Sequence, residues 1–62
     1  MIRYFHMPVT RNTVALVIEP GSAAETATPE QMSRRFGVEL QEISRKEYRR
    51  LTELYETEAA RR

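Results

Sequence analysis

The chain has 62 residues, of which 40% are hydrophobic and 31% are charged, with a formal net charge of +1 and no cysteine. A chain of this length buries only roughly 60% of the surface that its unfolded form exposes, so we expect a single small domain of marginal stability over residues 1–62. The absence of cysteine excludes a disulfide framework and a thiolate-bound zinc site, which leaves association into a homo-oligomer as the remaining source of added stability.

No segment of the sequence is hydrophobic enough to cross a membrane. The longest apolar run, VALVI at residues 14–18, is far shorter than the ~20 residues that a transmembrane helix needs. After Met1 the chain has a basic residue and a proline in place of a continuous apolar stretch, so we expect no signal-peptide core. Together with the missing cysteines, these features predict a cytoplasmic protein without membrane contact.

The beginning of the chain has the composition of a β-hairpin. Residues 2–7 and 13–19 are rich in β-branched and aromatic side chains, which are typical of strands. Between them, Pro8 cannot donate to a strand ladder and Asn12 tolerates turn geometry. We therefore predict two antiparallel strands joined by the five-residue loop PVTRN.

A short helix is predicted over residues 29–36. Thr28 can accept a hydrogen bond at the N-cap, a proline follows at the first helical position, and Gln31 completes a capping box. Gly37 then supplies the residue that most easily takes the left-handed conformation at a helix end.

The segment after Gly37 has two interpretations. In the first, Ser44 and Glu47 form a second capping box, which places the start of the last helix at Arg45. Residues 38–43 are then a short third strand.

The second interpretation is a longer helix that runs back through Ser44 to Gln41. In that helix Ile43 would lie roughly 140° from Tyr48, so the apolar stripe of the last helix would lose its register. We therefore favour the strand and predict an α+β fold of order ββαβα, a small antiparallel sheet covered on one face by both helices. The single domain then consists of a hairpin at 1–19, a loop at 20–27 and a helix–strand–helix unit at 28–60.

The stretch QMSRRFGVELQEIS resembles the core of a bacterial helix-turn-helix. The residues that carry the resemblance are Ser33, Gly37, Val38 and Ile43, with Met32 and Phe36 as the inward-facing pair. The resemblance implies that residues 29–50 form a DNA-binding unit whose second helix lies in or near the major groove. The side chains then closest to bases or phosphates would be Gln41, Glu42, Arg45 and Lys46.

Several features depart from that family. Lys46 occupies a position that is usually apolar, and Glu39 and Glu42 would repel phosphate. A β-hairpin precedes the motif in place of a supporting helix. The stretch EISRKEYRRL at residues 42–51 is also similar to a segment of small uncharacterised bacterial and phage proteins, which implies a helix cap and an apolar stripe but no activity.

Basic side chains are concentrated in the second half of the chain and are the main candidates for a binding surface. They would bind nucleic-acid phosphate or an acidic protein, or else form a solvated helix surface with weak ion pairs to neighbours such as Glu53. The candidates are Arg34, Arg35, Arg45, Lys46, Arg49 and Arg50.

The predicted last helix carries an apolar stripe whose members are three or four positions apart. Because this helix is long for so small a body, we expect part of the stripe to contact a second copy of the chain. The unpaired hairpin edge offers another route to a dimer. The stripe, which serves as core or as dimer seam, consists of Tyr48, Leu51, Tyr55 and Ala59.

No residue pattern indicates catalysis or cofactor binding. His6 is the only histidine, and the chain has neither cysteine nor aspartate to combine with it in a triad or a metal site. Its two glycines cannot form a known phosphate-binding loop. We therefore expect a non-enzymatic module without metal or cofactor that binds a macromolecule as a homodimer, of bacterial, phage or mobile-element origin. The alternative is a DNA-binding transcriptional regulator that uses residues 29–50.

Overall fold

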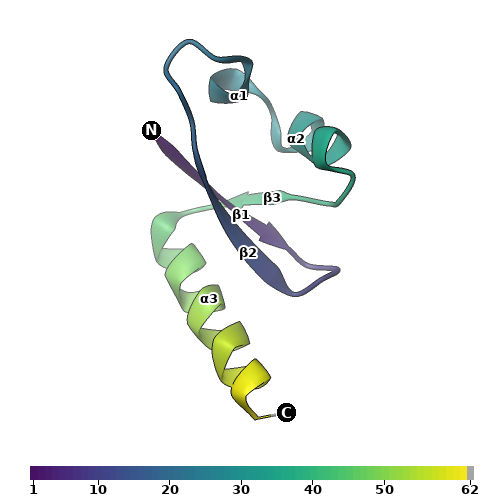
Figure 1. The fold of residues 1–62 in the computed structure, drawn as a ribbon, viewed down its shortest axis with the longest axis vertical. Helices are drawn as coiled ribbons and strands as arrows, with labels where there is room; N and C mark the ends of the chain where they lie inside the picture. Colours follow the sequence, from purple (N-terminus) through teal and green to yellow (C-terminus); the bar gives the residue numbers. More distant parts are fainter. Residues whose placement is uncertain (62) are drawn as a thin grey trace.

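The computed structural model describes residues 1–61, and its elements follow the order ββααβα (Figure 1). One antiparallel sheet, with strand order β2-β1-β3, is formed by β1 (Ile2–Met7), β2 (Asn12–Val17) and β3 (Gln41–Ile43). The helices are α1 (Ala23–Thr26), α2 (Pro29–Phe36) and α3 (Arg45–Ala60). The predicted α+β architecture, with a hairpin, a short helix, a third strand and a long C-terminal helix, is confirmed.

The hairpin differs from the prediction at its turn. Asn12 is already paired with Met7, so the loop consists of residues 8–11 and is one residue shorter than expected. The left-handed conformation falls on Arg11, with a φ of 52°, and not on Asn12. The Arg11 guanidinium binds both carboxylate oxygens of Glu58 at 2.7 Å and lies 5.0 Å from the ring centroid of Tyr55. These contacts hold the Arg11 side chain against α3 beside the turn.

The helix α2 has the ends that the sequence predicts. The Thr28 hydroxyl accepts from the Gln31 N–H at 3.1 Å, and the Gln31 side chain accepts from the Thr28 N–H at 2.9 Å, which completes the capping box. Gly37 is left-handed, with a φ of 71°, and its N–H donates to the Ser33 carbonyl. The loop before α2 is more regular than expected, because residues 23–26 form the one-turn helix α1.

The strand interpretation of the segment before α3 is confirmed. Ser44 is extended, with φ −75° and ψ 163°, and its hydroxyl accepts from the Glu47 N–H at 3.1 Å, so that α3 begins at Arg45. Only the serine half of the predicted capping box forms, because the Glu47 carboxylate pairs with Arg50 instead.

The strand β3 is shorter than the predicted span of residues 38–43. Leu40 donates its N–H to the Ser33 hydroxyl at 2.8 Å and accepts from the same hydroxyl at 3.3 Å. The backbone before Gln41 is therefore bound to α2 and does not join the ladder with β1.

The sheet has two faces, and each packs against a different helix. Tyr4 lies against Tyr48 of α3, with ring centroids 4.9 Å apart, on what we call the α3 face. Phe5 points to the opposite side, the α2 face, where it is fully buried with Met32 and Leu40. The expectation that both helices cover one face is therefore wrong. The cause is the position of β3, which separates α2 from α3 and allows the chain to change sides (Figure 1).

The buried core is small. Phe5, at its centre, is the one large side chain in the described part of the chain that is fully buried. The buried apolar residues are Phe5, Ile18, Met32, Leu40 and Leu51. Among residues 1–61, no helix combines the length and the hydrophobicity that crossing a membrane requires.

Candidate functional site

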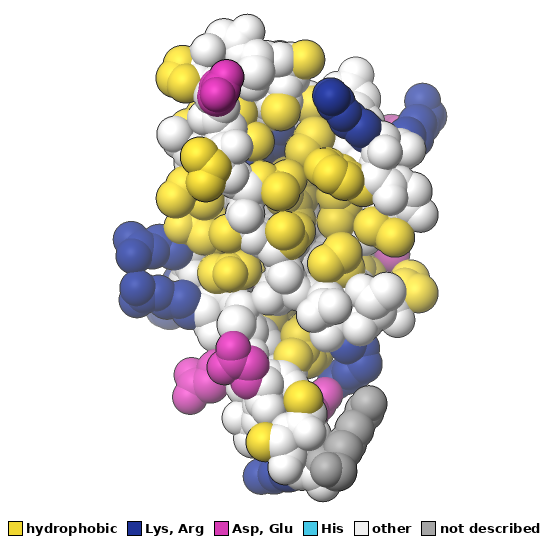
Figure 2. Space-filling view, in the orientation of Figure 1, with side chains coloured by type: hydrophobic (Ala, Val, Ile, Leu, Met, Phe, Trp, Pro, Cys, Tyr) yellow, Lys and Arg dark blue, Asp and Glu magenta, His cyan; other side chains and the backbone are white. Residues whose placement is uncertain are grey.

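An apolar groove remains open on the α2 face of the sheet. Its volume is about 200 Å³, and Phe36 and Val38 at its rim are 52% and 37% exposed. In Figure 2, hydrophobic side chains gather over the middle of the molecule, around α2 and the sheet. We use the name apolar groove for the hollow lined by Met7, Val14, Leu16, Phe36, Val38 and Leu40.

A second hollow adjoins the apolar groove between α1 and α2. The two hollows share Leu16 and Phe36 in their linings, so they lie next to each other. Arg35 lines the second hollow, and no carboxylate of the described residues lies within 4 Å of its guanidinium. Its neighbour Arg34 differs, because it pairs with Glu30 at 2.8 Å. An apolar surface with an unpaired cation at its margin is suited to an apolar ligand that carries an acidic group.

A half-buried ion pair lies on the same face of the sheet as Phe5. Arg3 is only 7% exposed, and its Nε and Nη2 donate to the two carboxylate oxygens of Glu42, each at 2.8 Å. Its Nη1 donates to the Ala24 carbonyl at 2.7 Å. The hydrogen bond from Arg3 lowers the pKa of Glu42 and, reciprocally, raises that of Arg3. This pair was not predicted from the sequence, although alternation from Phe5 places Arg3 on the buried side of β1.

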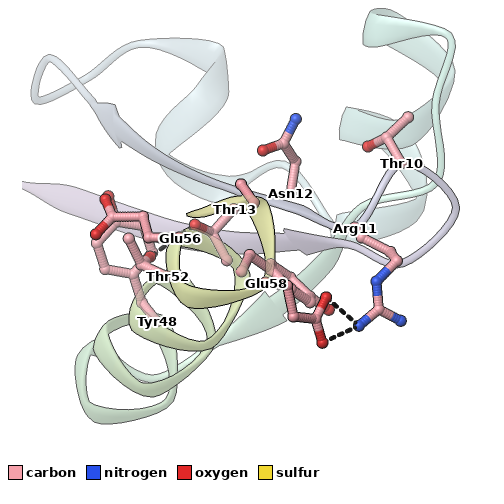
Figure 3. A pocket seen from close by; sticks show the side chains of 10 residues that line it. Thr10, Arg11, Asn12, Thr13, Tyr48, Thr52, Glu56 and Glu58 are labelled. Atoms are coloured by element: carbon pink, nitrogen blue, oxygen red, sulfur yellow. Dashed lines mark hydrogen bonds and ion pairs between the residues drawn. The ribbon is translucent and has the colours of Figure 1, made fainter. Parts of the chain in front are cut away.

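A polar hollow lies on the other side of the sheet, between α3 and the part of the hairpin that includes the turn and the start of β2 (Figure 3). Its side chains bind one another. Arg11 pairs with Glu58, as the dashed lines in Figure 3 show. The hydroxyls of Thr13 and Thr52 are 2.7 Å apart. This hollow is therefore a polar contact between the hairpin and α3.

His6, the only histidine of the chain, belongs to the same contact. Its Nε2 is 2.6 Å from the Tyr55 hydroxyl, and the two rings are stacked 5.8 Å apart. Neither partner is bound to a carboxylate or to a nucleophile in the part of the chain that is described. Within residues 1–61, no three His or Glu side chains lie close enough together to hold a metal ion. The geometry gives His6 a packing role.

The basic residues singled out in the sequence do not form one surface. Two lie at the C-terminal end of α2 and four in the first turns of α3, and Figure 2 shows Lys and Arg side chains in separate groups at the edges of the molecule. Arg50 pairs with Glu47, and not with Glu53 as expected, and this hydrogen bond raises the pKa of Arg50 and lowers that of Glu47. Four of the six basic residues have no carboxylate within 4 Å in the described chain, namely Arg35, Arg45, Lys46 and Arg49.

The helix-turn-helix geometry that the resemblance implies is not formed over residues 29–50. A strand and an extended serine separate α2 from α3, so the next helix begins only at Arg45 and not directly after the turn at Gly37. Two of the side chains that the resemblance would place near DNA have other positions. Gln41 pairs with His6 in the sheet, and Glu42 binds Arg3.

The apolar stripe of α3 packs on the sheet of its own chain. Tyr48 contacts Tyr4, Tyr55 contacts His6, and Leu51 is buried. Ala59 is exposed and lies at the wall of the polar hollow. The first three of these residues therefore contribute to the packing within one chain, and the role of the stripe as a dimer seam stays a prediction.

Comparison of the chain with protein-family models, with curated proteins and with solved structures found no match.

Proposed function

We propose that this chain is a non-enzymatic protein-interaction module whose binding surface is the apolar groove. The observation that carries the proposal is the exposure of Phe36 and Val38 beside an open apolar depression. Small proteins generally bury or disperse such side chains, and contiguous exposed apolar surface commonly marks a binding site. The lack of cysteine supports a cytoplasmic place of action.

The partner we propose is a segment of another protein with apolar anchor residues and at least one acidic residue. The anchors would occupy the apolar groove, and the carboxylate would meet Arg35, which has no ion-pair partner in the described chain. Hydrogen bonds between a guanidinium and a carboxylate are stronger and more directional than those between neutral groups. This complementarity selects acidic partners over basic ones.

We also propose a homodimer as the functional form. A chain with so few buried apolar residues gains stability when it associates, because association removes further apolar surface from water. Tyr48 and Tyr55 of the α3 stripe contact the sheet of their own chain and Leu51 is buried, so we place the dimer contact on the other surface that the sequence offered, the edge of the hairpin.

A random peptide library displayed on phage tests the binding surface. Selection on the immobilised chain should enrich peptides that combine apolar residues with Asp or Glu. Affinity for an enriched peptide should fall roughly tenfold or more in Val38→Asp, which puts a charge into the groove, and several-fold in Arg35→Gln. Leu54→Asp is the matched control, because it puts the same charge at a 42% exposed apolar residue of α3 that does not line the groove.

Circular dichroism should show native helix content in each of these variants. Failure to enrich any peptide above an unrelated protein of similar charge would contradict the proposal. So would a peptide that binds Val38→Asp as tightly as the original chain.

DNA binding is the competing function, since Arg45, Lys46 and Arg49 stay unpaired in the described chain at the start of α3. Glu47 lies among them, and the basic group on α2 is separate, so the cationic surface is small. We expect no gel shift of random duplex DNA at low salt, even at high micromolar protein. A shift that weakens steeply with added salt would favour the regulator instead.

A further inference from the structure

We infer that two copies of this chain pair through β2, antiparallel about a two-fold axis at Ala15, so that the two sheets become one. The inference rests on the dimeric form proposed above and adds the surface that forms it. β2 is the outer strand of the sheet along its whole length, because the strand order is β2-β1-β3.

The outer side of β2 carries a row of free backbone groups. The Ile18 N–H donates to the Met1 carbonyl at 2.8 Å, so these opposed residues form a hydrogen-bonded pair of the antiparallel ladder. Such pairs alternate along the ladder, and every second residue of β2 therefore directs its N–H and C=O away from β1. These residues are Thr13, Ala15 and Val17. In the described part of the chain, their outward groups bind no protein atom.

β2 lacks the features that protect edge strands from pairing. None of its residues is charged or proline, and Val17 is 81% exposed. Natural edges are usually shielded by charged side chains, proline, bulges or short length. The opposite edge has such protection, because β3 has only three residues and carries Glu42. The unprotected edge is therefore the one that fits another strand.

The sequence of the edge favours one register. Rotation about Ala15 places Thr13 opposite Val17 of the second copy, so all the outward-facing residues pair with one another. Rotation about Val14 would instead leave Val17 opposite Arg11, which is in the turn and left-handed.

Charge supports the same register. Rotation about Ala15 sets Arg11 of each copy opposite Glu19 of the other, whereas a parallel arrangement would set Arg11 against Arg11. The Glu19 carboxylate has no cation within 4 Å among the described residues. Arg11 binds Glu58 through Nη2 alone, which leaves its other N–H groups available.

The pairing also brings two apolar grooves together. Val14 and Leu16 line the groove on the α2 face, and in this register Val14 lies opposite Leu16 of the second copy. The dimer would therefore present both grooves side by side on one face of a continuous sheet. A partner segment longer than one groove could then contact both copies.

The oligomeric state measured by sedimentation equilibrium, from low to high micromolar protein, tests the interface. Ala15→Lys sets two lysines beside each other at the axis and should raise the dimer dissociation constant roughly tenfold or more. Ala15 is exposed, so the monomer should keep its fold, as circular dichroism would show. Ala60→Lys, the same change at an exposed position of α3, should leave the constant unchanged. Glu19→Lys should weaken the dimer by an amount that shrinks with added salt.

The register can be tested by NMR on a mixture of labelled and unlabelled chains. Opposed residues that do not exchange hydrogen bonds have Cα atoms about 4.5 Å apart, so a contact between the α-protons of Val14 and Leu16 of different copies is expected. A monomer at every concentration would overturn both the dimeric form and this interface. A dimer that persists in Ala15→Lys would overturn the interface alone, and a contact between the two Val14 residues would overturn the register.

Discussion

The guanidinium of Arg3, on β1, contacts two other elements that lie far from it in the sequence. It binds Glu42 of β3 and the Ala24 carbonyl of α1 from its own position on β1. Its burial could be predicted from sequence, because alternation along β1 puts Arg3 on the same side as Phe5. Its partner could not be, since Glu42 is 39 residues away and nothing local indicates that they meet. Long-range pairs depend on how whole elements pack, which periodicity within one element does not specify.

Removing the charge of Glu42 should therefore destabilise the fold. In Glu42→Gln the Arg3 guanidinium stays buried without a counter-charge, and we expect a loss of about 2 kcal/mol. That is less than for a fully buried pair, because the Glu42 side chain is 39% exposed. Urea denaturation at neutral pH measures the change. Glu39→Gln, at an exposed position nearby, should have little effect, and equal stabilities of the two variants would contradict a structural role for the pair.

The same pair should make stability depend on pH. Arg3 lowers the pKa of Glu42 below its ordinary value of 4.5, so the unfolded chain takes up this proton more readily than the folded one. The stabilisation is fully present above that ordinary value and is lost as the pH falls through the lower folded pKa. Thermal melting at decreasing pH should show this loss in the original chain and a weaker dependence in Glu42→Gln. The remainder in that variant would come from Glu47, whose pKa is lowered by Arg50 in the same direction.

At the scale of elements, the helix ends that depend on a capping residue were predicted correctly from the sequence. Thr28, Gln31 and Gly37 delimit α2, and Ser44 starts α3, because each acts on backbone groups within three or four residues. Boundaries that depend on contacts with distant parts of the chain were not predicted correctly. β3 begins at Gln41 and not at residue 38 as predicted, because the backbone N–H of Leu40 donates to the Ser33 hydroxyl of α2. The choice of sheet face for each helix was missed for the same reason.

The two residues of the predicted capping box at the start of α3, Ser44 and Glu47, should therefore contribute unequally to the free energy of unfolding. Ser44→Ala removes the acceptor of the Glu47 N–H and should cost about 1 kcal/mol. Glu47→Ala should cost less, because the Glu47 side chain binds Arg50 on the surface and not the Ser44 backbone. Chemical denaturation of both variants measures the difference. A larger loss in Glu47→Ala would mean that the complete capping box forms in solution.

At the scale of the whole molecule, the chain forms a long and thin body of 41 × 22 × 13 Å. A thin sheet with a helix on each side has little interior, which explains why so few side chains are buried. The apolar groove could not be predicted from the sequence, because in so thin a body an apolar residue can lie on the surface as easily as in the core. Met32 and Phe36 were both expected to face inward, but only Met32 is buried, and Phe36 lies at the groove. In this small protein, two apolar residues that are one helical turn apart can therefore differ completely, with one in the core and the other on the surface.

Stability should consequently depend on very few side chains. Phe5→Ala should cost roughly 3–5 kcal/mol, which is comparable to the entire stability of a domain of this size, so this chain should unfold. Phe36→Ala, the same substitution at a 52% exposed position, should leave the chain folded. Two-dimensional amide NMR spectra separate these outcomes through the dispersion of their signals. A well-dispersed spectrum for Phe5→Ala would place the stabilising contacts elsewhere.

The central position of β1 also limits how the length of this chain can vary. Successive residues of β1 serve opposite layers, with Phe5 in one and Tyr4 and His6 in the other. Inserting or deleting one residue within β1 would exchange the two sets and disrupt both layers at once. Length variation among descendants of this sequence should therefore be confined to the turn at residues 8–11 and the connection at 19–28, where an added residue changes neither layer.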